Sequence, residues 1–258
     1  MAGTLYLVPT PIGNLGDISR RIADTLGEVD FIAAEDTRVT VKLLNHFGIK
    51  KEMLSYYEHN KNSKGNLIIE RILNGESCAL VSDAGMPAIS DPGEDLVRQA
   101  HEVGICVESV PGPSALVTAL SISGMESGRF CFEGFLSVNK ISRKKHLEEV
   151  KNESRTMIFY EAPHKLPATL KDMLAVFGDR KIALVKELTK IHETVNGTTL
   201  SAAAEYYSEN TPKGEFVLII EGKRRENTEQ YSLEDAVKLA KRLIKEGKST
   251  SSAAKEAV

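Results

Sequence analysis

Three short stretches rich in glycine, proline and small polar residues are the parts of this chain best suited to bind a ligand. They are PTPIGNLGD (residues 9–17), SDAGMPAISDPG (residues 82–93) and PGPSA (residues 111–115). Glycine and alanine leave space for a ligand beside the backbone, and proline fixes a loop before binding. The second stretch also carries Asp83 and Asp91, and Glu94 follows it. Carboxylates in a loop repel phosphate and favour a ligand with a positive amine or sulfonium group.

The sequence lacks the motifs of the commoner nucleotide and metal sites. No GxGxxG follows a strand-like segment, so a dinucleotide site has no signature here. EGKST (residues 246–250) resembles the end of a phosphate-binding loop, but Arg242 stands where that motif requires glycine. The six histidines show no HExxH spacing, and Cys78, Cys106 and Cys131 form no CxxC pair. We therefore predict no metal site, and three free thiols in a reducing cytosol.

The elements that must hold the three stretches alternate between strand and helix. Short apolar strands are predicted at residues 5–8, 31–34, 53–57, 78–81 and 105–110, with amphipathic helices between them. This alternation is typical of βαβ units and a parallel sheet. The three loops follow the first, fourth and fifth of these strands. Open α/β sheets bind ligands at that edge.

The pattern changes after residue 115. Strands are predicted at residues 130–132, 157–160, 182–185 and 216–220, and a helix with Leu166, Leu170, Met173 and Phe177 on one face follows the second of them. We predict an α/β protein with a parallel domain over residues 1–115 and a second, more mixed α/β domain over residues 116–223. A helical tail over residues 224–258 begins a last helix and stops, so we expect it to be truncated.

Composition limits the classes of function. Of the 258 residues, 41% are hydrophobic, which is enough to bury a core. The formal net charge is −3, so any contact with nucleic acid must use a local basic patch. No apolar run reaches membrane-spanning length and no signal segment precedes the first strand. We expect a cytoplasmic protein that does not bind a membrane.

Six segments together resemble one known family. They are LYLVPTPIGNLGDIS, AAEDTR, VSDAGMPAISDPG, VPGPSA, FYEAPHK and KELTKIHE, in this order between about residues 3 and 222. The chain resembles the ribosomal RNA small subunit methyltransferase I group of the tetrapyrrole methylase superfamily. The resemblance implies two α/β domains with S-adenosylmethionine in the cleft between them, and a homodimer. It also implies methyl transfer to the ribose 2′-hydroxyl of a cytidine in the decoding region of small-subunit (16S) ribosomal RNA, free or in the 30S subunit.

The resemblance also implies which residues hold the cofactor. They are Pro11, Ser82, Asp83, Ala84, Gly85, Ile89, Ser114, Ala115, Tyr160, Glu187 and Leu188. The residue types agree with this assignment, because Asp83 can pair with the ammonium group and Ser114 can donate to the carboxylate near a helix N-terminus. Met86 departs from the pattern, because threonine is more usual there. It is larger and cannot hydrogen-bond, which affects the fit of the loop.

The implied reaction needs few catalytic groups, because a sulfonium methyl is already activated. The acceptor oxygen must be held in line and kept dry, and a base or a positive charge would assist the weakly nucleophilic hydroxyl. We predict Arg38 and Lys186 as contacts to RNA phosphate or to the forming alkoxide, and His59 or Glu161 for proton transfer. Plainer roles stay open. Asp36 can cap a helix, and His59 can be an ordinary turn residue.

A basic run lies between residues 140 and 155. Its members are Lys140, Arg143, Lys144, Lys145, Lys151 and Arg155, interspersed with three glutamates. Such a run is either an exposed helix face or a lip that grips RNA backbone. Two other functions stay open for the whole chain. One is a methyltransferase acting on a tetrapyrrole or another small molecule, and the other is a non-enzymatic module that binds an adenosyl ligand or the ribosome.

Overall fold

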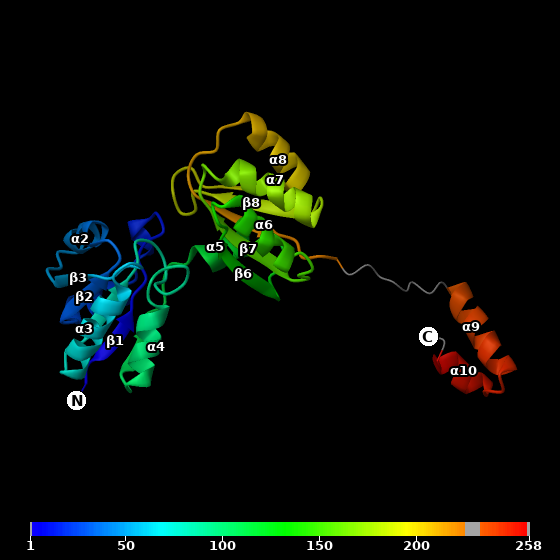
Figure 1. Ribbon diagram of the computed structural model, residues 1–258, viewed down its shortest axis with the longest axis horizontal. Helices are drawn as coiled ribbons and strands as arrows, with labels where there is room; N and C mark the ends of the chain where they lie inside the picture. The colour runs from blue at the N-terminus through cyan, green and yellow to red at the C-terminus, as the bar shows by residue number, and fades with distance from the viewer. Residues whose placement is uncertain (1, 225–232, 257–258) are drawn as a thin grey trace. The chain divides into compact units, whose positions relative to one another are not determined.

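A computed structural model describes residues 2–224 and 233–256 of the chain. The chain forms two compact units, residues 1–223 and residues 224–258. The first unit contains two β-sheets (Figure 1), and the second contains two helices, α9 (Leu233–Lys245) and α10 (Thr250–Glu256). Within the described ranges, no helix combines the length and the apolar character needed to cross a bilayer.

The first sheet has five parallel strands in the order β3-β2-β4-β1-β5. Their bounds are β1 (Thr4–Leu7), β2 (Phe31–Ala34), β3 (Glu52–Ser55), β4 (Cys78–Val81) and β5 (Cys106–Ser109). Strands β2 and β4 are apolar and buried along their whole length (FIAA and CALV). Continuous burial of this kind follows from helices covering both faces of a parallel sheet.

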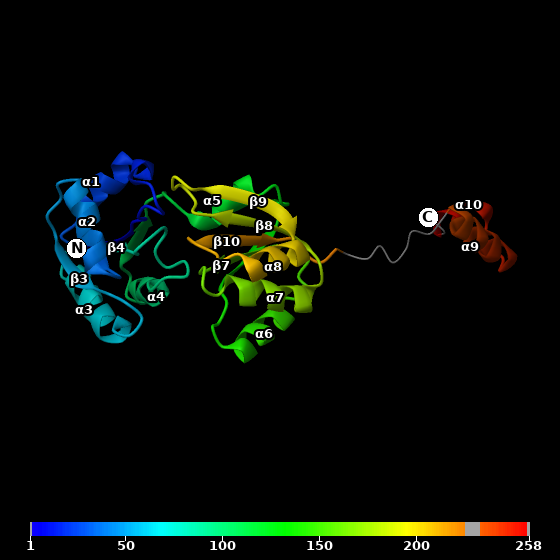
Figure 2. The same ribbon diagram turned by 90° about the horizontal axis from the view of Figure 1, so that it is seen from above.

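Helices on opposite faces of this sheet create an opening at its carboxyl edge. The helices are α1 (Arg20–Glu28), α2 (Thr37–His46), α3 (Lys61–Leu73) and α4 (Glu94–Glu102), and a short 3-10 helix, η1 (Leu15–Asp17), precedes α1. Helices α1 and α2 pack on one face through Ile22 and Leu43, whereas α3 and α4 pack on the other through Ile68 and Leu96 (Figure 2). The chain therefore leaves the neighbouring strands β1 and β4 toward opposite faces, which is the topology that binds ligands in open α/β sheets.

The second sheet is mixed and has the order β6-β7-β10-β8-β9, with only β6 and β7 parallel among its pairs. Its strands are β6 (Phe130–Phe135), β7 (Thr156–Glu161), β8 (Lys181–Lys186), β9 (Thr194–Thr199) and β10 (Phe216–Ile220). Its helices are α5 (Ala115–Ile122), α6 (Lys140–Glu149), α7 (Leu166–Phe177) and α8 (Leu200–Glu209). The mixed sheet confirms the prediction of a second, mixed α/β region.

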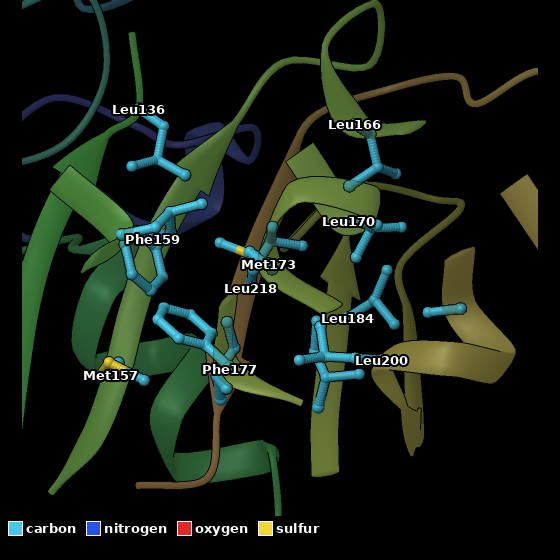
Figure 3. Packing of buried hydrophobic residues seen from close by; sticks show 14 of the residues in the cluster. Leu136, Met157, Phe159, Leu166, Leu170, Met173, Phe177, Leu184, Leu200 and Leu218 are labelled. Atoms are coloured by element: carbon cyan, nitrogen blue, oxygen red, sulfur yellow. The ribbon is translucent and has the colours of Figure 1, made fainter. Parts of the chain in front are cut away.

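Alternating side chains of the second sheet build two cores. Figure 3 shows Leu170 and Met173 of α7 among the strand residues Phe159 and Leu218, which face one side of the sheet. On the opposite face, α5 packs through Leu120 and its neighbours against the alternate residues of β7 and β10. A buried side chain of this size contributes about 2 kcal/mol. Helix α5 therefore packs as part of the layer of helices that covers the second sheet.

The predicted elements match the structure where strands are apolar and buried. The predictions at residues 31–34, 78–81 and 216–220 agree residue by residue with β2, β4 and β10. Strand β9 and helix α8 were not predicted, and α6 lies inside the segment marked only by its charges. Strand β9 and helix α6 carry few apolar residues on a regular period, so the sequence gives little sign of them. Helix α8 does show such a period, because Leu200, Ala203, Ala204 and Tyr207 stand at i, i+3, i+4 and i+7 and pack on the core, and the prediction missed it.

Candidate active site at the carboxyl edge of the first sheet

A cavity of about 480 Å³ lies between the loops of the first sheet and the ends of strands in the second. From the first sheet it is lined by Ile12, Glu35, Asp83, Ala84, Gly85, Met86, Ile89, Ser90 and Asp91. From α5 and the second sheet it is lined by Ser114, Ala115, Phe135, Tyr160, Glu161, Ala162, Pro163, Val185, Leu188, Glu215, Phe216 and Val217. Its volume falls in the range of small-molecule and cofactor sites.

Two loops that form the floor of the cavity are bonded to each other. The Thr10 amide donates to the Gly85 carbonyl (2.9 Å), and the Gly85 amide donates to the Thr10 carbonyl (3.1 Å). The Thr10 hydroxyl donates to the Ser82 carbonyl (3.0 Å), and the buried Ser82 hydroxyl donates to the Gly85 carbonyl (3.2 Å). Gly85 has φ +86°, in the left-handed region that favours glycine. The loops are therefore fixed by their own backbone.

The first loop also reaches the elements of the second sheet. Ile12 packs against the core formed by α5, β7 and β10. A Cβ on Gly13, where φ is +144°, would lie 2.6 Å from the Lys190 Cγ. Only glycine allows this approach without a shift of the neighbouring chain. The contact joins the first loop to the segment that follows β8.

One end of the cavity is acidic. Burial, and then repulsion by Glu35 and Asp83, raises the pKa of Asp91 to about 7. Burial also raises the pKa of Glu35 and of Asp83, with repulsion among these carboxyls and Asp36 adding to the effect. The Arg38 guanidinium bonds to Asp36 instead (Nη2 to Oδ2 2.6 Å). Carboxyl groups held together in this way favour a positively charged ligand.

Another part of the lining is apolar and aromatic. The Tyr160 ring lies edge-on to Phe132 (centroids 4.9 Å apart) and to Phe135 (5.4 Å). Burial raises the pKa of the Tyr160 hydroxyl to about 12, although a hydrogen bond from the backbone of Leu116 opposes the shift. Leu188 is buried beside them. Flat, apolar walls of this kind suit an aromatic ring system.

The N-terminus of α5 also lines the cavity, through Ser114 and Ala115. Ser114 is the N-cap residue, but its side chain makes no capping hydrogen bond, so its hydroxyl can turn to a ligand. The first amides of a helix and its dipole attract a carboxylate. The cavity thus offers three environments, which are apolar, anion-binding and acidic. A molecule with an aromatic ring, a carboxylate and a positive centre fits all three.

A second hollow of about 510 Å³ opens beside the acidic end. It is lined by Glu35, Tyr57, Glu58, Ala88, Ser90, Asp91, Pro92 and Glu94. Glu35, Ser90 and Asp91 line both hollows. We call the first hollow the inner cavity and the second the outer groove.

Comparison with known proteins identifies the family. The model for Tetrapyrrole (Corrin/Porphyrin) Methylases matches residues 4–204. The chain is 47% identical to Ribosomal RNA small subunit methyltransferase I of Haemophilus influenzae, over 95% of this chain and 88% of the relative. It is 53% identical to the protein of the same name from Halalkalibacterium halodurans, over 85% and 76%. This chain belongs to the ribosomal RNA small subunit methyltransferase I family.

Solved structures agree on the fold of this methyltransferase I family member. Uroporphyrin-III-C-methyltransferase from Thermus thermophilus superposes with a TM-score of 0.60 at 17% identity, over 85% of this chain and 94% of that chain. Diphthine synthase superposes with a TM-score of 0.63 at 15% identity, over 86% and 90%. The predicted tetrapyrrole methylase-like architecture of two α/β sheets is confirmed.

The inner cavity gathers most of the residues that the sequence nominated for cofactor binding in this methyltransferase I family member. Those that line it are Asp83, Ala84, Gly85, Ile89, Ser114, Ala115, Tyr160 and Leu188. Pro11 and Ser82 lie behind the floor, where they line a separate hollow of about 280 Å³. Glu187 accepts hydrogen bonds from the Glu215 amide (3.0 Å) and from Lys190 Nζ (3.0 Å), next to the wall residue Leu188. Met86, the departure from the family pattern, lines the cavity.

The side chains nominated for catalysis are scattered. Glu161 lines the cavity, but its carboxylate is buried and accepts from Thr169 Oγ1 (2.6 Å) and pairs with Lys165 Nζ (2.8 Å). Lys186 ends β8 and does not line the inner cavity. Arg38 is 89% exposed and pairs with Asp36, which caps α2. His59 lies in the turn after β3, edge-on to Tyr57 of the outer groove (centroids 6.3 Å apart).

The basic run has fewer exposed and unpaired cations than its sequence suggests. Arg143 is buried, where its guanidinium pairs with Asp172 (Nη2 to Oδ2 2.7 Å) and donates to the carbonyls of Ser137 and Val138. The expectation that Arg143 belongs to an exposed basic lip is wrong, because α6 turns this position toward α7. Arg155 is paired with Glu153 within the same segment. The exposed cations left on α6 are Lys140, Lys144 and Lys145.

Several lining residues were not nominated from the sequence. They are Met86, Ser90, Asp91, Phe135, Ala162, Pro163, Val185, Glu215, Phe216 and Val217. Those on the second sheet stand at the ends of β6, β7, β8 and β10, and only the fold brings these ends to the loops of the first sheet. Asp91 had a signal of its own, because it is an acidic residue inside the most distinctive loop.

Proposed function

We propose that this chain transfers a methyl group from S-adenosylmethionine to the ribose 2′-hydroxyl of a cytidine in the decoding region of 16S ribosomal RNA. The observation that carries the proposal is its identity of about half, over most of its length, with proteins named Ribosomal RNA small subunit methyltransferase I. The inner cavity supports it, since its lining offers apolar, anion-binding and acidic groups, and this cofactor carries an adenine ring, a carboxylate and positive groups.

Different residues of the cavity would contact different parts of S-adenosylmethionine. Tyr160, Leu188 and Ile12 would enclose the adenine. Ser114 and the first amides of α5 would bind the carboxylate, and Asp83 would bind the ammonium group. Gly85, Ala84, Ala115 and Ile89 shape the floor. Ser82, Pro11 and Glu187 would act from behind, by holding the loops that present these groups.

We propose more limited roles for the four side chains that the sequence suggested for catalysis. Bound S-adenosylmethionine supplies an activated methyl group, so the protein must position the acceptor and manage one proton. Glu161, whose carboxylate is already engaged by Lys165 and Thr169, would hold the cavity wall. Arg38 and Lys186 remain candidates for phosphate contacts, and His59 for a contact beside the outer groove.

Exposed lysines on α6 support an RNA-binding role. Lys140, Lys144 and Lys145 lie exposed on α6, which begins five residues after the lining residue Phe135. Replacing Lys144 and Lys145 together by alanine should weaken RNA binding and lower the slope of log K against log salt by about two. A matched variant, Lys238→Ala with Lys241→Ala on α9, removes the same charge elsewhere and serves as the control. An unchanged affinity and slope in the α6 variant would remove this part of the proposal.

A homodimer is part of the proposal. Val117 and Ile122 on α5 are exposed, and Val195 of β9 pairs with Val185, which belongs to the core on the α5 side of the sheet. An exposed apolar surface of this kind favours association. Light scattering should give twice the mass of one chain, and Val117→Lys should shift the protein toward monomer. We place the reaction in the cytoplasm, on the small ribosomal subunit.

Labelled methyl transfer tests the activity directly. The protein is incubated with methyl-labelled S-adenosylmethionine and, separately, with unmodified 30S subunits, naked 16S RNA and a porphyrinoid macrocycle. We expect label in RNA at one position that resists alkaline cleavage, because a 2′-O-methyl group removes the attacking hydroxyl. Label in the macrocycle alone would favour the small-molecule methyltransferase. Binding of S-adenosylmethionine without transfer to any acceptor would favour the non-enzymatic module.

A further inference from the structure

The inner cavity and the outer groove meet at Glu35, Ser90 and Asp91. The inner cavity has the apolar surfaces suited to an adenine ring. The outer groove is lined by Tyr57, an exposed aromatic residue, and by short loops of the first domain. An acceptor that approaches through the outer groove therefore meets these three side chains first.

Asp91 is held at this junction by the loop that carries it. Ala88 (φ 67°) and Ser90 (φ 62°) both adopt left-handed backbone, which costs roughly 1 kcal/mol or more for each non-glycine residue. Ser82, whose buried hydroxyl donates to the Gly85 carbonyl (3.2 Å), lies close enough to Asp91 to lower its pKa in part, against the larger effect of burial. Strain of this kind persists only where the surrounding structure imposes it, so the position of Asp91 is set by the fold.

The groups around Asp91 are acidic or neutral. Glu35 from the loop after β2 and Asp83 from the loop after β4 act on its charge, and Asp91 in turn acts on the Tyr160 hydroxyl of the second sheet. Glu58 and Glu94 line the outer groove beside it. Burial and these neighbours raise the pKa of Asp91 to about 7. A carboxyl group that titrates near neutral pH is matched to proton transfer.

The other acidic groups are less suited to that task. Glu161 is already bonded to Lys165 and Thr169. Asp83 accepts a hydrogen bond from the Asp36 amide (3.1 Å) and lines only the inner cavity of the two. Glu35 accepts from the Asp83 amide (3.4 Å).

We propose that Asp91 is the general base of the methyl transfer, accepting the proton of the 2′-hydroxyl that enters from the outer groove. The inference rests on the proposed function. The ribose oxygen forms a bond to the methyl carbon while the carbon–sulfur bond breaks, and the electron pair of that bond stays on sulfur. The hydroxyl proton passes to the Asp91 carboxylate and from there to water in the outer groove. The products are the 2′-O-methyl ribose and S-adenosylhomocysteine, and Asp91 is regenerated as its carboxylate.

The test combines binding with single-turnover rates, for Asp91→Asn, Asp91→Glu and the control Glu102→Gln. The control removes one negative charge from an exposed residue at the end of α4 that lines neither hollow. We expect Asp91→Asn to slow methyl transfer by about 10²–10³-fold and to abolish the rise of the wild-type rate with pH. Asp91→Glu should recover part of the rate, and Glu102→Gln should stay within about threefold of wild type.

Calorimetry with S-adenosylmethionine and S-adenosylhomocysteine gives the second readout and verifies folding. We expect both dissociation constants to change by less than about threefold in Asp91→Asn, because a base for the acceptor need not touch the cofactor. A wild-type rate in this variant would overturn the inference while leaving the proposed function intact. So would a loss traced to weaker binding of S-adenosylmethionine alone, which would assign Asp91 to the sulfonium. A wild-type protein that transfers no methyl group to RNA would overturn both proposals.

Discussion

Thr10 and Gly85 exchange two backbone hydrogen bonds across the carboxyl edge of the first sheet, 2.9 Å and 3.1 Å long. One residue follows β1 and the other follows β4, so the pair joins two loops that are 75 positions apart in the chain. The bridge gives the floor of the inner cavity a fixed shape before any ligand enters. Preformed sites lose less entropy when they bind.

Gly85→Ala should therefore weaken cofactor binding as well as stability. Its φ of +86° disfavours any Cβ, and the added methyl would lie 3.4 Å from Ile12 Cγ2 at the cavity wall. We expect a loss of about 1–2 kcal/mol in the free energy of unfolding and about tenfold weaker binding of S-adenosylmethionine, measured by urea titration and calorimetry. Gly104→Ala is the control, because its φ is +76° and its Cβ would meet open space. Equal loss of affinity in both variants would contradict this prediction.

Two substitutions of Tyr160 should show whether its ring or its hydroxyl contacts S-adenosylmethionine. Its ring packs against Phe132 and Phe135, whereas its hydroxyl accepts from the backbone of Leu116. We expect Tyr160→Ala to weaken S-adenosylmethionine binding at least tenfold and to cost about 2–4 kcal/mol of stability. Tyr160→Phe should change the affinity by less than about threefold.

An exposed tyrosine serves as the control for this series. Tyr206 lies on α8 with 57% of its surface exposed and does not line the inner cavity. Tyr206→Ala should leave both the affinity and the free energy of unfolding nearly unchanged. If Tyr160→Phe weakens binding as much as Tyr160→Ala, the hydroxyl rather than the ring makes the contact.

The sequence was sufficient to place half of the cavity. Parallel strands bring all their carboxyl ends to one edge, so loops separated along the chain, such as those around Asp83 and Ser114, could be grouped from the strand pattern alone. The other half required the fold. Phe135 and Val217 stand at the ends of strands in a second, mixed sheet whose order does not follow the chain.

Two further features depended on tertiary contacts. Strand β9 (TVNGTT) is exposed over most of its length and is held as an edge strand by pairing with β8, so it shows no apolar period to recognise. Arg143 stands among exposed lysines in the sequence, yet α6 places it against Asp172 of α7. No local pattern distinguishes a cation that finds a buried partner from one that stays in solvent.

The Arg143–Asp172 pair predicts a large loss of stability when it is broken. Both side chains are buried, with 7% and 9% of their surfaces exposed, so Arg143→Met would leave a carboxylate without its partner. We expect a loss of about 3–5 kcal/mol in the free energy of unfolding, measured by urea titration. Replacing both residues by apolar side chains should lose less than the single change. Arg20→Ala, which breaks the exposed pair with Asp24, should cost well under 1 kcal/mol.

Asp91 and Asp36 should give opposite pH dependence of stability. Burial raises the pKa of Asp91 from 3.8 to about 7, so the folded state binds a proton that the unfolded state releases, and stability falls as pH rises from about 4 to 7. Asp91→Asn should therefore gain stability relative to wild type across this window. The gain should be on the order of 1 kcal/mol above pH 7, because the partly exposed carboxyl is screened by water. Below about pH 4 the two proteins should differ little.

Hydrogen bonds from Arg38 lower the pKa of Asp36 to about 2, so its ionised form stabilises the folded state above about pH 4 and this contribution disappears as pH falls through 2. Asp36→Asn isolates the charge, because asparagine caps a helix as well as aspartate does. We expect this variant to be less stable than wild type at pH 7 and to approach wild type as the pH falls toward 2. Urea midpoints at pH 3, 5, 7 and 8.5 measure both differences. A difference for Asp91→Asn that stays constant over this range would show that Asp91 does not titrate near neutral pH in the folded protein.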